Sequence, residues 1–132
     1  MQNILVVEDF QPFREFVCSI VMAAIPAANV CETADGLEAV SLARELPFDL
    51  ITLDIGLPGL NGLQVARRIL TFAPQSRILF VSQDSSRNVT REALSLGAAG
   101  YVHKTDAGKE LARAIAAAVR NTVFVSTTCH DA

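Results

Sequence analysis

The sequence predicts a single α/β domain built around a parallel β-sheet. Five short apolar segments alternate with five segments whose apolar residues recur every three or four positions. Strands that alternate with helices in this way are typical of a parallel sheet. Two of the short segments, at 4–7 and 78–81, are unbroken apolar runs, as expected for strands that are buried on both faces. The length of 132 residues also fits one domain.

The first strand is expected at residues 3–8, because Ile4 to Val7 are all aliphatic. Pro12 suits the first turn of a helix. The apolar stripe of this helix comprises Phe13, Phe16, Val17, Ile20, Val21 and Ala24, and Pro26 ends the helix. A weaker strand at 29–33 and an Asp35-Gly36 turn precede a second helix, which Pro47 stops. Its stripe comprises Ala39, Val40, Ala43 and Leu46.

The third strand, at residues 50–53, delivers Asp54 into a loop with three glycines and a proline. Asn61 is the expected N-cap of the next helix. That helix has the stripe Leu63, Ala66, Ile69, Leu70 and Ala73, and Pro74 closes it. A fourth apolar run at 77–82 predicts the fourth strand.

Ser85 or Ser86 is expected to cap the fourth helix, and Gly97 to end it. Its apolar face (Val89, Ala93, Leu96) is the thinnest, so we expect this helix to be the least firmly held. A short strand follows at 99–103. Asp106 is the expected cap of a last helix with the face Leu111, Ile115, Ala118 and Val119.

Composition excludes several classes of protein. A net charge of −3 argues against a nucleic-acid-binding surface, which would carry a basic stripe. No apolar run approaches the length of a membrane span, and no signal peptide is evident. Cys18, Cys31 and Cys129 show no paired spacing and fit free thiols, with the first two in apolar settings. His103 and His130 lack ligand spacing as well, so we assign no His/Cys metal site. Because free thiols fit a reducing compartment, we expect a cytoplasmic protein.

Polar residues collect at the carboxyl ends of the predicted strands, where ligands bind in open parallel sheets. Glu8 and Asp9 follow the first strand, Asp54 the third and Lys104 the fifth, while Ser82 ends the fourth. Each of these residues alone is ordinary in a turn or at a surface. Their coincidence at four strand ends predicts a functional site.

Magnesium fits the expected cluster. Three carboxylates in one cleft repel one another, and a hard cation with oxygen ligands relieves that repulsion. Lys104 adds a positive charge suited to a phosphate oxygen. A carboxylate beside a metal and a phosphoryl group indicates phosphoryl transfer to carboxylate, which gives an acyl phosphate.

Four motifs occur together in order: Ile-Leu-Val-Val-Glu-Asp at 4–9, Asp-Ile-Gly-Leu-Pro-Gly-Leu-Asn-Gly at 54–62, Phe-Val-Ser at 80–82 and Gly-Ala-Ala-Gly-Tyr-Val-His-Lys at 97–104. With these motifs the sequence resembles the response-regulator receiver domain of two-component signalling over residues 2 to about 120. The resemblance implies a flavodoxin-like (CheY-like) three-layer sandwich, with a five-stranded parallel sheet in the order 2-1-3-4-5 and five helices. Residues 1–120 would be the receiver domain and 121–132 a tail or the start of a linker.

The resemblance also implies roles for individual residues. Asp54 would be the phosphoacceptor. Glu8, Asp9, Asp54 and the backbone carbonyl of Gly56 would hold Mg²⁺, Asp9 more directly than Glu8. Ser82 would be the switch hydroxyl, Lys104 would pair with a phosphoryl oxygen, and Tyr101 would change its burial with the switch. The fourth helix, fifth strand and fifth helix would form the output surface.

The implied partners are a sensor histidine kinase or phosphotransfer protein, or a small phosphoryl donor, and a second copy of the chain. Direct contact with nucleic acid or membrane is not expected. The Lys-Thr-Asp-Ala run at 104–107 and the Val-Phe-Val-Ser tail at 123–126 resemble NarL/LuxR-type regulators, whose receivers precede a DNA-binding helix-turn-helix that this chain lacks. We therefore expect an excised or truncated receiver that controls transcription through an effector domain, with a stand-alone receiver as the alternative.

Three departures from the family pattern stand out. Thr105 follows Lys104 where many members have a cis-proline, so a cis bond is doubtful. Gln83 follows Ser82 where small residues are frequent, and its longer side chain would restrict access to the phosphoryl group. Gly56 and Asp84 occupy two variable positions that resemble tuning sites for dephosphorylation.

Competing hypotheses remain beside the phosphorylation switch. A phosphatase or phosphotransferase of the haloacid-dehalogenase type would need an aspartate two residues after Asp54, where this chain has Gly56. A phosphorylation-independent adaptor would keep the fold but need neither the complete acidic set nor Lys104. A nucleotide-binding module is disfavoured because no glycine-rich loop follows the first strand. We therefore expect no enzyme activity beyond the domain's own phosphorylation and dephosphorylation.

Overall fold

The computed structural model describes residues 1–126; Cys129 and His130 lie outside the described residues. Six parallel strands form one sheet in the order β2-β1-β3-β4-β5-β6. The strands are β1 (Asn3–Val7), β2 (Asn29–Thr33), β3 (Leu50–Leu53), β4 (Arg77–Ser82), β5 (Gly100–His103) and β6 (Phe124–Val125). The predicted order of the first five strands is confirmed.

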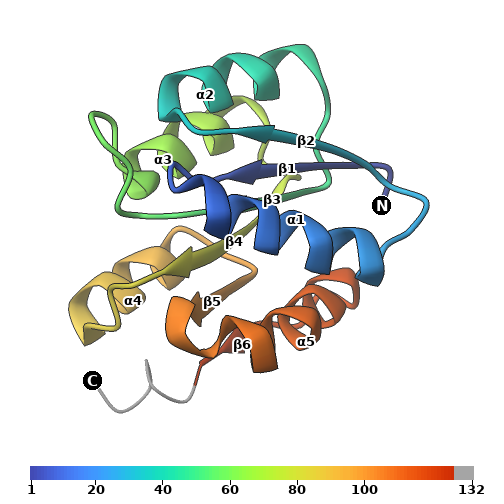
Figure 1. Ribbon diagram of the computed structural model, residues 1–132. Helices are drawn as coiled ribbons and strands as arrows, with labels where there is room; N and C mark the ends of the chain where they lie inside the picture. The colour runs from blue at the N-terminus through green and yellow to red at the C-terminus, as the bar shows by residue number, and fades with distance from the viewer. Residues whose placement is uncertain (127–132) are drawn as a thin grey trace.

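Helices cover both faces of the sheet, which gives three layers (Figure 1). They are α1 (Gln11–Ala24), α2 (Gly36–Glu45), α3 (Gly62–Phe72), α4 (Arg87–Ser95) and α5 (Ala107–Val119), with a 3₁₀ turn at Lys104–Asp106. α2, α3 and α4 pack on one face, and α1 and α5 on the other. The predicted five α-helices and three-layer architecture are therefore confirmed.

The unbroken aliphatic runs are buried on both faces, as predicted. In β1, Leu5 and Val7 face the core beneath α2 and α3, whereas Ile4 and Val6 face the core beneath α1 and α5. Successive side chains of a strand point to opposite faces, so both cores need apolar residues from every central strand.

The predicted count of five strands is wrong. The sixth strand, β6, lies in the segment expected to be a tail or linker and pairs in parallel with β5. A two-residue strand has no apolar periodicity of its own to reveal it. Thr122 N and Oγ1 both donate to the Ala117 carbonyl at the end of α5, which directs the chain back to the sheet edge.

Four predicted core positions are also wrong, and one of them is Leu46, the last residue of the second stripe, which is 42% exposed. Val119 is 48% exposed, since the buried face of α5 runs through Leu111, Ile115 and Ala118. Phe16 and Ala24 are exposed on α1, where Cys18 is buried instead. These positions lie at the edge of each helical stripe, where a 100° step per residue separates buried from exposed side chains.

Most helix ends follow the sequence signals, although Asp106 is the N-cap residue of α5 without a side-chain capping hydrogen bond. Asn61 caps α3 in a reciprocal capping box with Gln64, and the Ser86 hydroxyl accepts from Val89 N at the start of α4. Asp35, expected in a turn, is the N-cap of α2. Gly97 has φ +87°, as its predicted stop position requires. α4 buries only Thr90 and Ala93, so its thin apolar face is confirmed, while its mobility stays a prediction.

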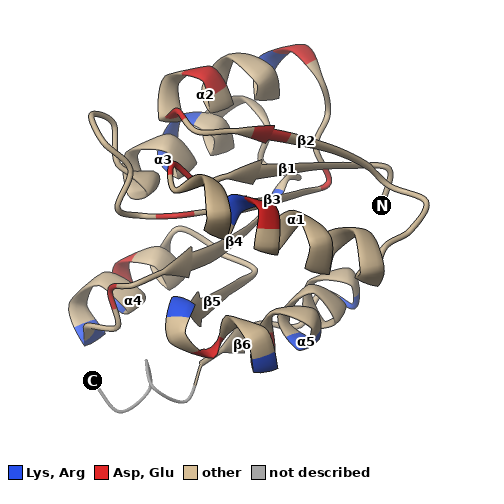
Figure 2. Ribbon diagram, in the orientation of Figure 1, with Lys and Arg blue, Asp and Glu red and all other residues tan. Residues whose placement is uncertain are grey.

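The remaining composition-based predictions concern charge, thiols and membrane spans. Basic and acidic residues are interspersed along α1, α2, α4 and α5 (Figure 2). Cys18 and Cys31 are free thiols, the first buried and the second partly buried; burial raises the pKa of Cys18 to about 11. None of the helices within residues 1–126 is long and apolar enough to cross a membrane.

At the carboxyl ends of the strands, where the predicted site residues collect, the strand order reverses at β1. β1 pairs with β2 on one side and with β3 on the other, so the loops after β1 and β3 diverge. Such a switch point leaves a crevice at the carboxyl ends of the strands. The register places Val7 opposite Leu53, and hence Glu8 beside Asp54.

Candidate functional site

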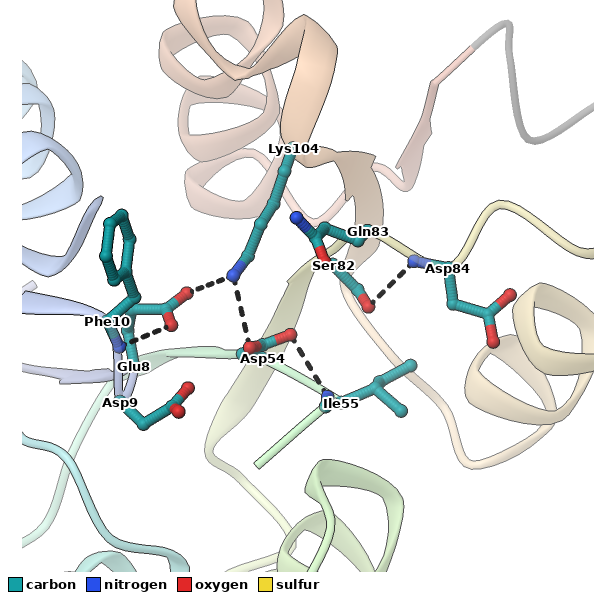
Figure 3. A pocket seen from close by; sticks show the side chains of 10 residues that line it. Glu8, Asp9, Phe10, Asp54, Ile55, Ser82, Gln83, Asp84 and Lys104 are labelled. Atoms are coloured by element: carbon teal, nitrogen blue, oxygen red, sulfur yellow. Dashed lines mark hydrogen bonds and ion pairs between the residues drawn. The ribbon is translucent and has the colours of Figure 1, made fainter. Parts of the chain in front are cut away.

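A cavity of about 710 Å³ opens at this edge of the sheet (Figure 3). Its lining contains Glu8, Asp9, Phe10, Asp54, Ile55, Gly56, Ser82, Gln83, Asp84 and Lys104. The residues predicted from four separate strand ends therefore meet in one place. Tyr101, the remaining predicted site residue, is fully buried beneath the cavity rather than part of its lining.

Asp54 is a buried carboxylate, 5% exposed, directly after β3. Its Oδ1 accepts a hydrogen bond from Gly56 N at 3.1 Å, and its Oδ2 lies 3.2 Å from Lys104 Nζ. Gly62 allows the loop to fold back on itself, because a Cβ there would lie 2.2 Å from the Asp54 carbonyl oxygen. The glycine at the start of α3 thus fixes the backbone that presents the carboxylate.

Glu8 is the most deeply buried acid of the site, 2% exposed. Its Oε1 lies 2.6 Å from Lys104 Nζ, and its Oε2 accepts from Phe10 N at 3.0 Å. Burial raises the pKa of Glu8, the nearby charge of Asp54 adds to this effect, and the hydrogen bonds from Lys104 and Phe10 oppose it.

Lys104 bridges the two carboxylates (Figure 3). Its side chain is only 15% exposed. Burial acts to lower its pKa, but the hydrogen bond to Glu8 and the charge of Asp54 outweigh burial and raise it. The lysine therefore stays a cation beside Asp54.

Glu8, Asp9 and Asp54 form a carboxylate cluster that is compatible with a metal ion. One oxygen from each lies within 4.8 Å of the others. Mg²⁺ binds oxygen ligands at about 2.0–2.1 Å and retains waters, so two ligands on one ion lie up to about 4.2 Å apart. Small side-chain shifts would bring all three oxygens within reach, and exposed Asp9 is the freest to move.

The loop after β4 contains the predicted switch residues. Ser82 is buried, and its Oγ accepts from Asp84 N at 3.2 Å. The Tyr101 hydroxyl donates to the Asp84 carbonyl oxygen. A short chain of hydrogen bonds thus joins the hydroxyl at the cavity to the buried aromatic residue of β5.

The departures noted in the sequence have structural correlates. Gln83 lines the cavity, and its carbonyl accepts from His103 Nε2 at 2.8 Å. Thr105 lies in the 3₁₀ turn that begins at Lys104, and residues 1–126 contain no cis peptide bond. The Gly56 carbonyl, predicted as a metal ligand, belongs to a cavity-lining residue, and its coordination stays a prediction.

Sequence reasoning missed two side chains near the site. Lys104 Nζ lies 4.8 Å from the centroid of the Phe13 ring on α1. Phe10 lines the cavity and is 62% exposed. The helical spacing predicts Phe13 in a core stripe, and nothing in that spacing distinguishes a core ring from one that also faces a cation. An exposed aromatic residue directly after an acidic pair was the available signal for Phe10.

Comparison with known proteins gives a consistent result. The family model of the response regulator receiver domain matches residues 4–116. Among curated proteins, the chain is 30% identical over 126 residues to the glycerol metabolism activator of Pseudomonas putida, covering 95% of this chain and 57% of that protein. It is 32% identical over 132 residues to the transcription regulator BvgA of Bordetella pertussis, covering 99% and 63%. The chain thus spans about 60% of the length of these relatives.

Solved structures agree with the sequence comparison. A LuxR-family two-component response regulator from Aurantimonas is 30% identical, with a TM-score of 0.89 over 98% of this chain and 92% of that chain. The signal receiver domain of NarL from Mycobacterium tuberculosis is 28% identical, with a TM-score of 0.79 over 90% and 96%. The predicted likeness to the NarL/LuxR type is confirmed by these neighbours.

Proposed function

The chain belongs to the response regulator receiver domain family, and from this premise we propose that it accepts a phosphoryl group on Asp54. One observation carries the proposal. Asp54 is a buried carboxylate that faces the cavity beside two further carboxylates. It is paired with Lys104, which directly follows β5. A carboxylate held against a cation beside a candidate metal cluster is equipped for phosphoryl transfer.

The transfer would run as follows. An Asp54 carboxylate oxygen attacks phosphorus of a phosphohistidine, the new O–P bond forms, and the P–N bond breaks with its electron pair left on the imidazole, which takes up a proton. Acetyl phosphate would instead release acetate. Later attack of water on the acyl phosphate returns the Asp54 carboxylate and phosphate. Lys104, 3.2 Å from Asp54 Oδ2, would pair with a phosphoryl oxygen.

Glu8, Asp9 and Asp54 would hold Mg²⁺, with the Gly56 carbonyl as a further proposed ligand. When bound, the ion would offset the negative charge that gathers as the phosphoryl group is transferred. Asp9 is exposed and has room to bind directly, whereas Glu8 is already engaged by Lys104.

Ser82 and Tyr101 would convert phosphorylation into a change at the α4, β5 and α5 surface. The Ser82 hydroxyl would turn toward a phosphoryl oxygen and release Asp84 N. Because Asp84 also accepts from the Tyr101 hydroxyl, movement of that loop would alter the packing of the ring. The adjacent helix α4 buries only two side chains, so it is the element that can move most readily in response.

The cellular role follows from the relatives. We propose a cytoplasmic receiver that takes phosphate from a sensor histidine kinase or phosphotransfer protein. It would dimerise or bind an effector through the α4, β5 and α5 surface to control transcription. One of the two relatives is named as a transcription regulator and both are longer than this chain, which supports control of transcription through an effector domain. A phosphorylation-independent adaptor is the alternative, and we propose no turnover of external substrates.

Intact-mass measurement after incubation with acetyl phosphate and Mg²⁺ tests the proposal. Wild type should gain one phosphoryl group, EDTA should prevent the gain, and Asp54→Asn should remain unmodified. Glu45→Gln is the control, because Glu45 is an exposed carboxylate of α2 that lies outside both the cavity lining and the carboxylate cluster. Uptake by Asp54→Asn would refute the assignment of the acceptor.

Absence of uptake by wild type calls for a second donor. A phosphorylated histidine kinase should then modify the wild type if Gln83 restricts only the small donor. Failure with both donors would favour the adaptor. Binding to partners that is unchanged by Asp54→Asn would support the same conclusion.

A further inference from the structure

We propose that Phe13 is a positioning residue that holds the Lys104 ammonium beside Asp54 through a cation–π contact. The inference rests on the proposed phosphoryl transfer and assigns a role to a residue of α1. Lys104 Nζ lies 4.8 Å from the Phe13 ring centroid, within the ~6 Å range of such contacts. No part of the acidic cluster supplies this contact.

Lys104 needs a restraint of this kind. Its four-carbon stem is flexible, and the residue begins a single 3₁₀ turn rather than a long helix. In the structure its ammonium touches Glu8 Oε1, Asp54 Oδ2 and the face of the Phe13 ring. Three contacts from different elements fix one long side chain.

Only one of the three contacts would be unaffected by metal binding. Glu8 and Asp54 belong to the cluster that would hold Mg²⁺, so a bound cation competes with Lys104 for their oxygens. Mg²⁺ takes oxygen ligands, and an aromatic face is not among them. The Phe13 ring would therefore keep the ammonium in place when the carboxylates turn toward the metal.

The ring itself is held by its surroundings. Phe13 lies in the first turns of α1 and packs against Phe16, with the ring centroids 5.7 Å apart and the planes tilted by 42°. Phe13 itself is partly buried and packs against the apolar core that α1 and α5 share. That packing limits the motion of the ring beneath Lys104.

Graded fluorination of the ring gives the sharpest test. Mono-, di- and trifluorinated phenylalanine placed at position 13 weaken the ring's negative face while nearly conserving its shape. The initial rate of phosphorylation by acetyl phosphate and Mg²⁺ should fall stepwise, by about two- to fivefold at the last step. Phe13→Trp should retain the rate, and Phe13→Leu should lose as much as the trifluorinated ring.

The same substitutions at position 16 are the matched control. Phe16 is on the same helix, but Lys104 lies over the ring of Phe13. A rate that falls with fluorination at position 13 and not at 16 supports the proposal. A flat series at position 13 overturns it, since a purely packing role would not respond to the charge distribution of the ring.

A metal-free measurement separates this inference from the proposed function. In EDTA, the effects of Phe13→Leu and Lys104→Met on the unfolding equilibrium should be non-additive by about two- to fivefold. Additive effects overturn the inference even if phosphorylation occurs. If Lys104→Met does not fold, the fluorinated series should instead lower stability stepwise at position 13 only. If the wild type takes up no phosphate, the stability measurements in EDTA still test the contact between Phe13 and Lys104.

Discussion

Lys104 Nζ lies 2.6 Å from Glu8 Oε1, which joins the end of β5 to the end of β1. The Glu8 side chain is 3% exposed and the Lys104 side chain 15%, so the pair is largely shielded from water. The same ammonium lies 3.2 Å from Asp54 Oδ2. One cation therefore pairs with two buried carboxylates, and its loss leaves both without a cationic partner.

We expect Lys104→Met to lower the free energy of unfolding by about 2 kcal/mol at neutral pH, because a buried charge left unpaired is costly. Loss of the cation raises the pKa of Glu8 further, so the folded variant binds a proton that the unfolded chain does not. Its stability deficit should therefore shrink as the pH falls. Urea denaturation at several pH values measures both effects.

Lys109→Met is the control for this experiment, since Lys109 is exposed on α5. It should change stability by less than about 0.5 kcal/mol at every pH. A Lys104→Met deficit that is the same at neutral and acid pH would show that the lysine acts through packing rather than charge.

Magnesium should raise the thermal midpoint of the wild type. A ligand that binds only the folded state at ten times its Kd adds about 1.4 kcal/mol of stability. Asp9→Asn should lose most of this gain because it removes the most accessible ligand of the cluster. Glu45→Gln, which removes an exposed carboxylate of α2, should retain the gain. Equal gains in both variants would place the metal elsewhere.

The sequence predicted what depends on strand ends and missed what depends on contacts between distant segments. Asp54 and Lys104 directly follow strands and Ser82 ends one, so the parallel topology alone brings them together. The bridge from Lys104 to Glu8 depends on rotamers, which periodicity does not specify. β6 escaped prediction because two residues have no pattern, and its position depends on the existing edge of β5.

Gly62→Ala should be strongly destabilising, by about 3 kcal/mol, and should slow phosphorylation as well. A Cβ there would lie 2.2 Å from the Asp54 carbonyl oxygen and 2.7 Å from Ile55 Cα. Both are backbone atoms, so relief of the clash must shift the loop that presents the acceptor. Chemical denaturation and the rate of acetyl phosphate uptake measure the two effects.

Gly108→Ala is the matched glycine substitution. Its nearest contact would be Phe16 Cζ at 3.8 Å, an ordinary van der Waals distance. Alanine within a helix should leave stability unchanged or raise it by up to about 1 kcal/mol. If Gly62→Ala and Gly108→Ala changed the free energy of unfolding equally, the close backbone approach at residue 62 would not be what requires glycine there.

Asp49 should make stability depend on acid pH. Its Oδ2 accepts from Gln2 N at 2.7 Å and Asn3 N at 3.1 Å, and these bonds lower the pKa of the carboxyl group. A lowered pKa in the folded state contributes stability above the unfolded value of 3.8, which is lost as the pH falls through the folded value. Asp49→Ala should thus cost about 1 kcal/mol near neutral pH and almost nothing in strong acid.

The comparison with Asp35→Ala makes this prediction specific. Asp35 caps α2 through one backbone bond, from Glu38 N, and lies in a different part of the chain. Protection of the β1 amides from hydrogen exchange should fall in Asp49→Ala and not in Asp35→Ala. A pH-independent deficit for Asp49→Ala would exclude the charged form as its source.

Ser126 fastens the end of the described chain to the sheet edge, and Ser126→Ala should cost about 1–2 kcal/mol. The residue is fully buried. Its hydroxyl donates to Glu110 Oε1 at 2.5 Å and accepts from His103 N at 3.0 Å, while its own amide donates to the Tyr101 carbonyl. Alanine keeps the β6 backbone bond but leaves a carboxylate and an amide without this partner.

Thermal unfolding of Ser126→Ala and of Thr122→Ser tests the role of the hydroxyl. Thr122→Ser retains its bond to the Ala117 carbonyl and should lose little. Because the Ser126 bonds reach β5 and α5 together, their loss should also raise hydrogen exchange at His103, at the edge of the proposed output surface. Unchanged exchange at His103 in a destabilised Ser126→Ala would mean that β6 supports the fold without restraining that surface.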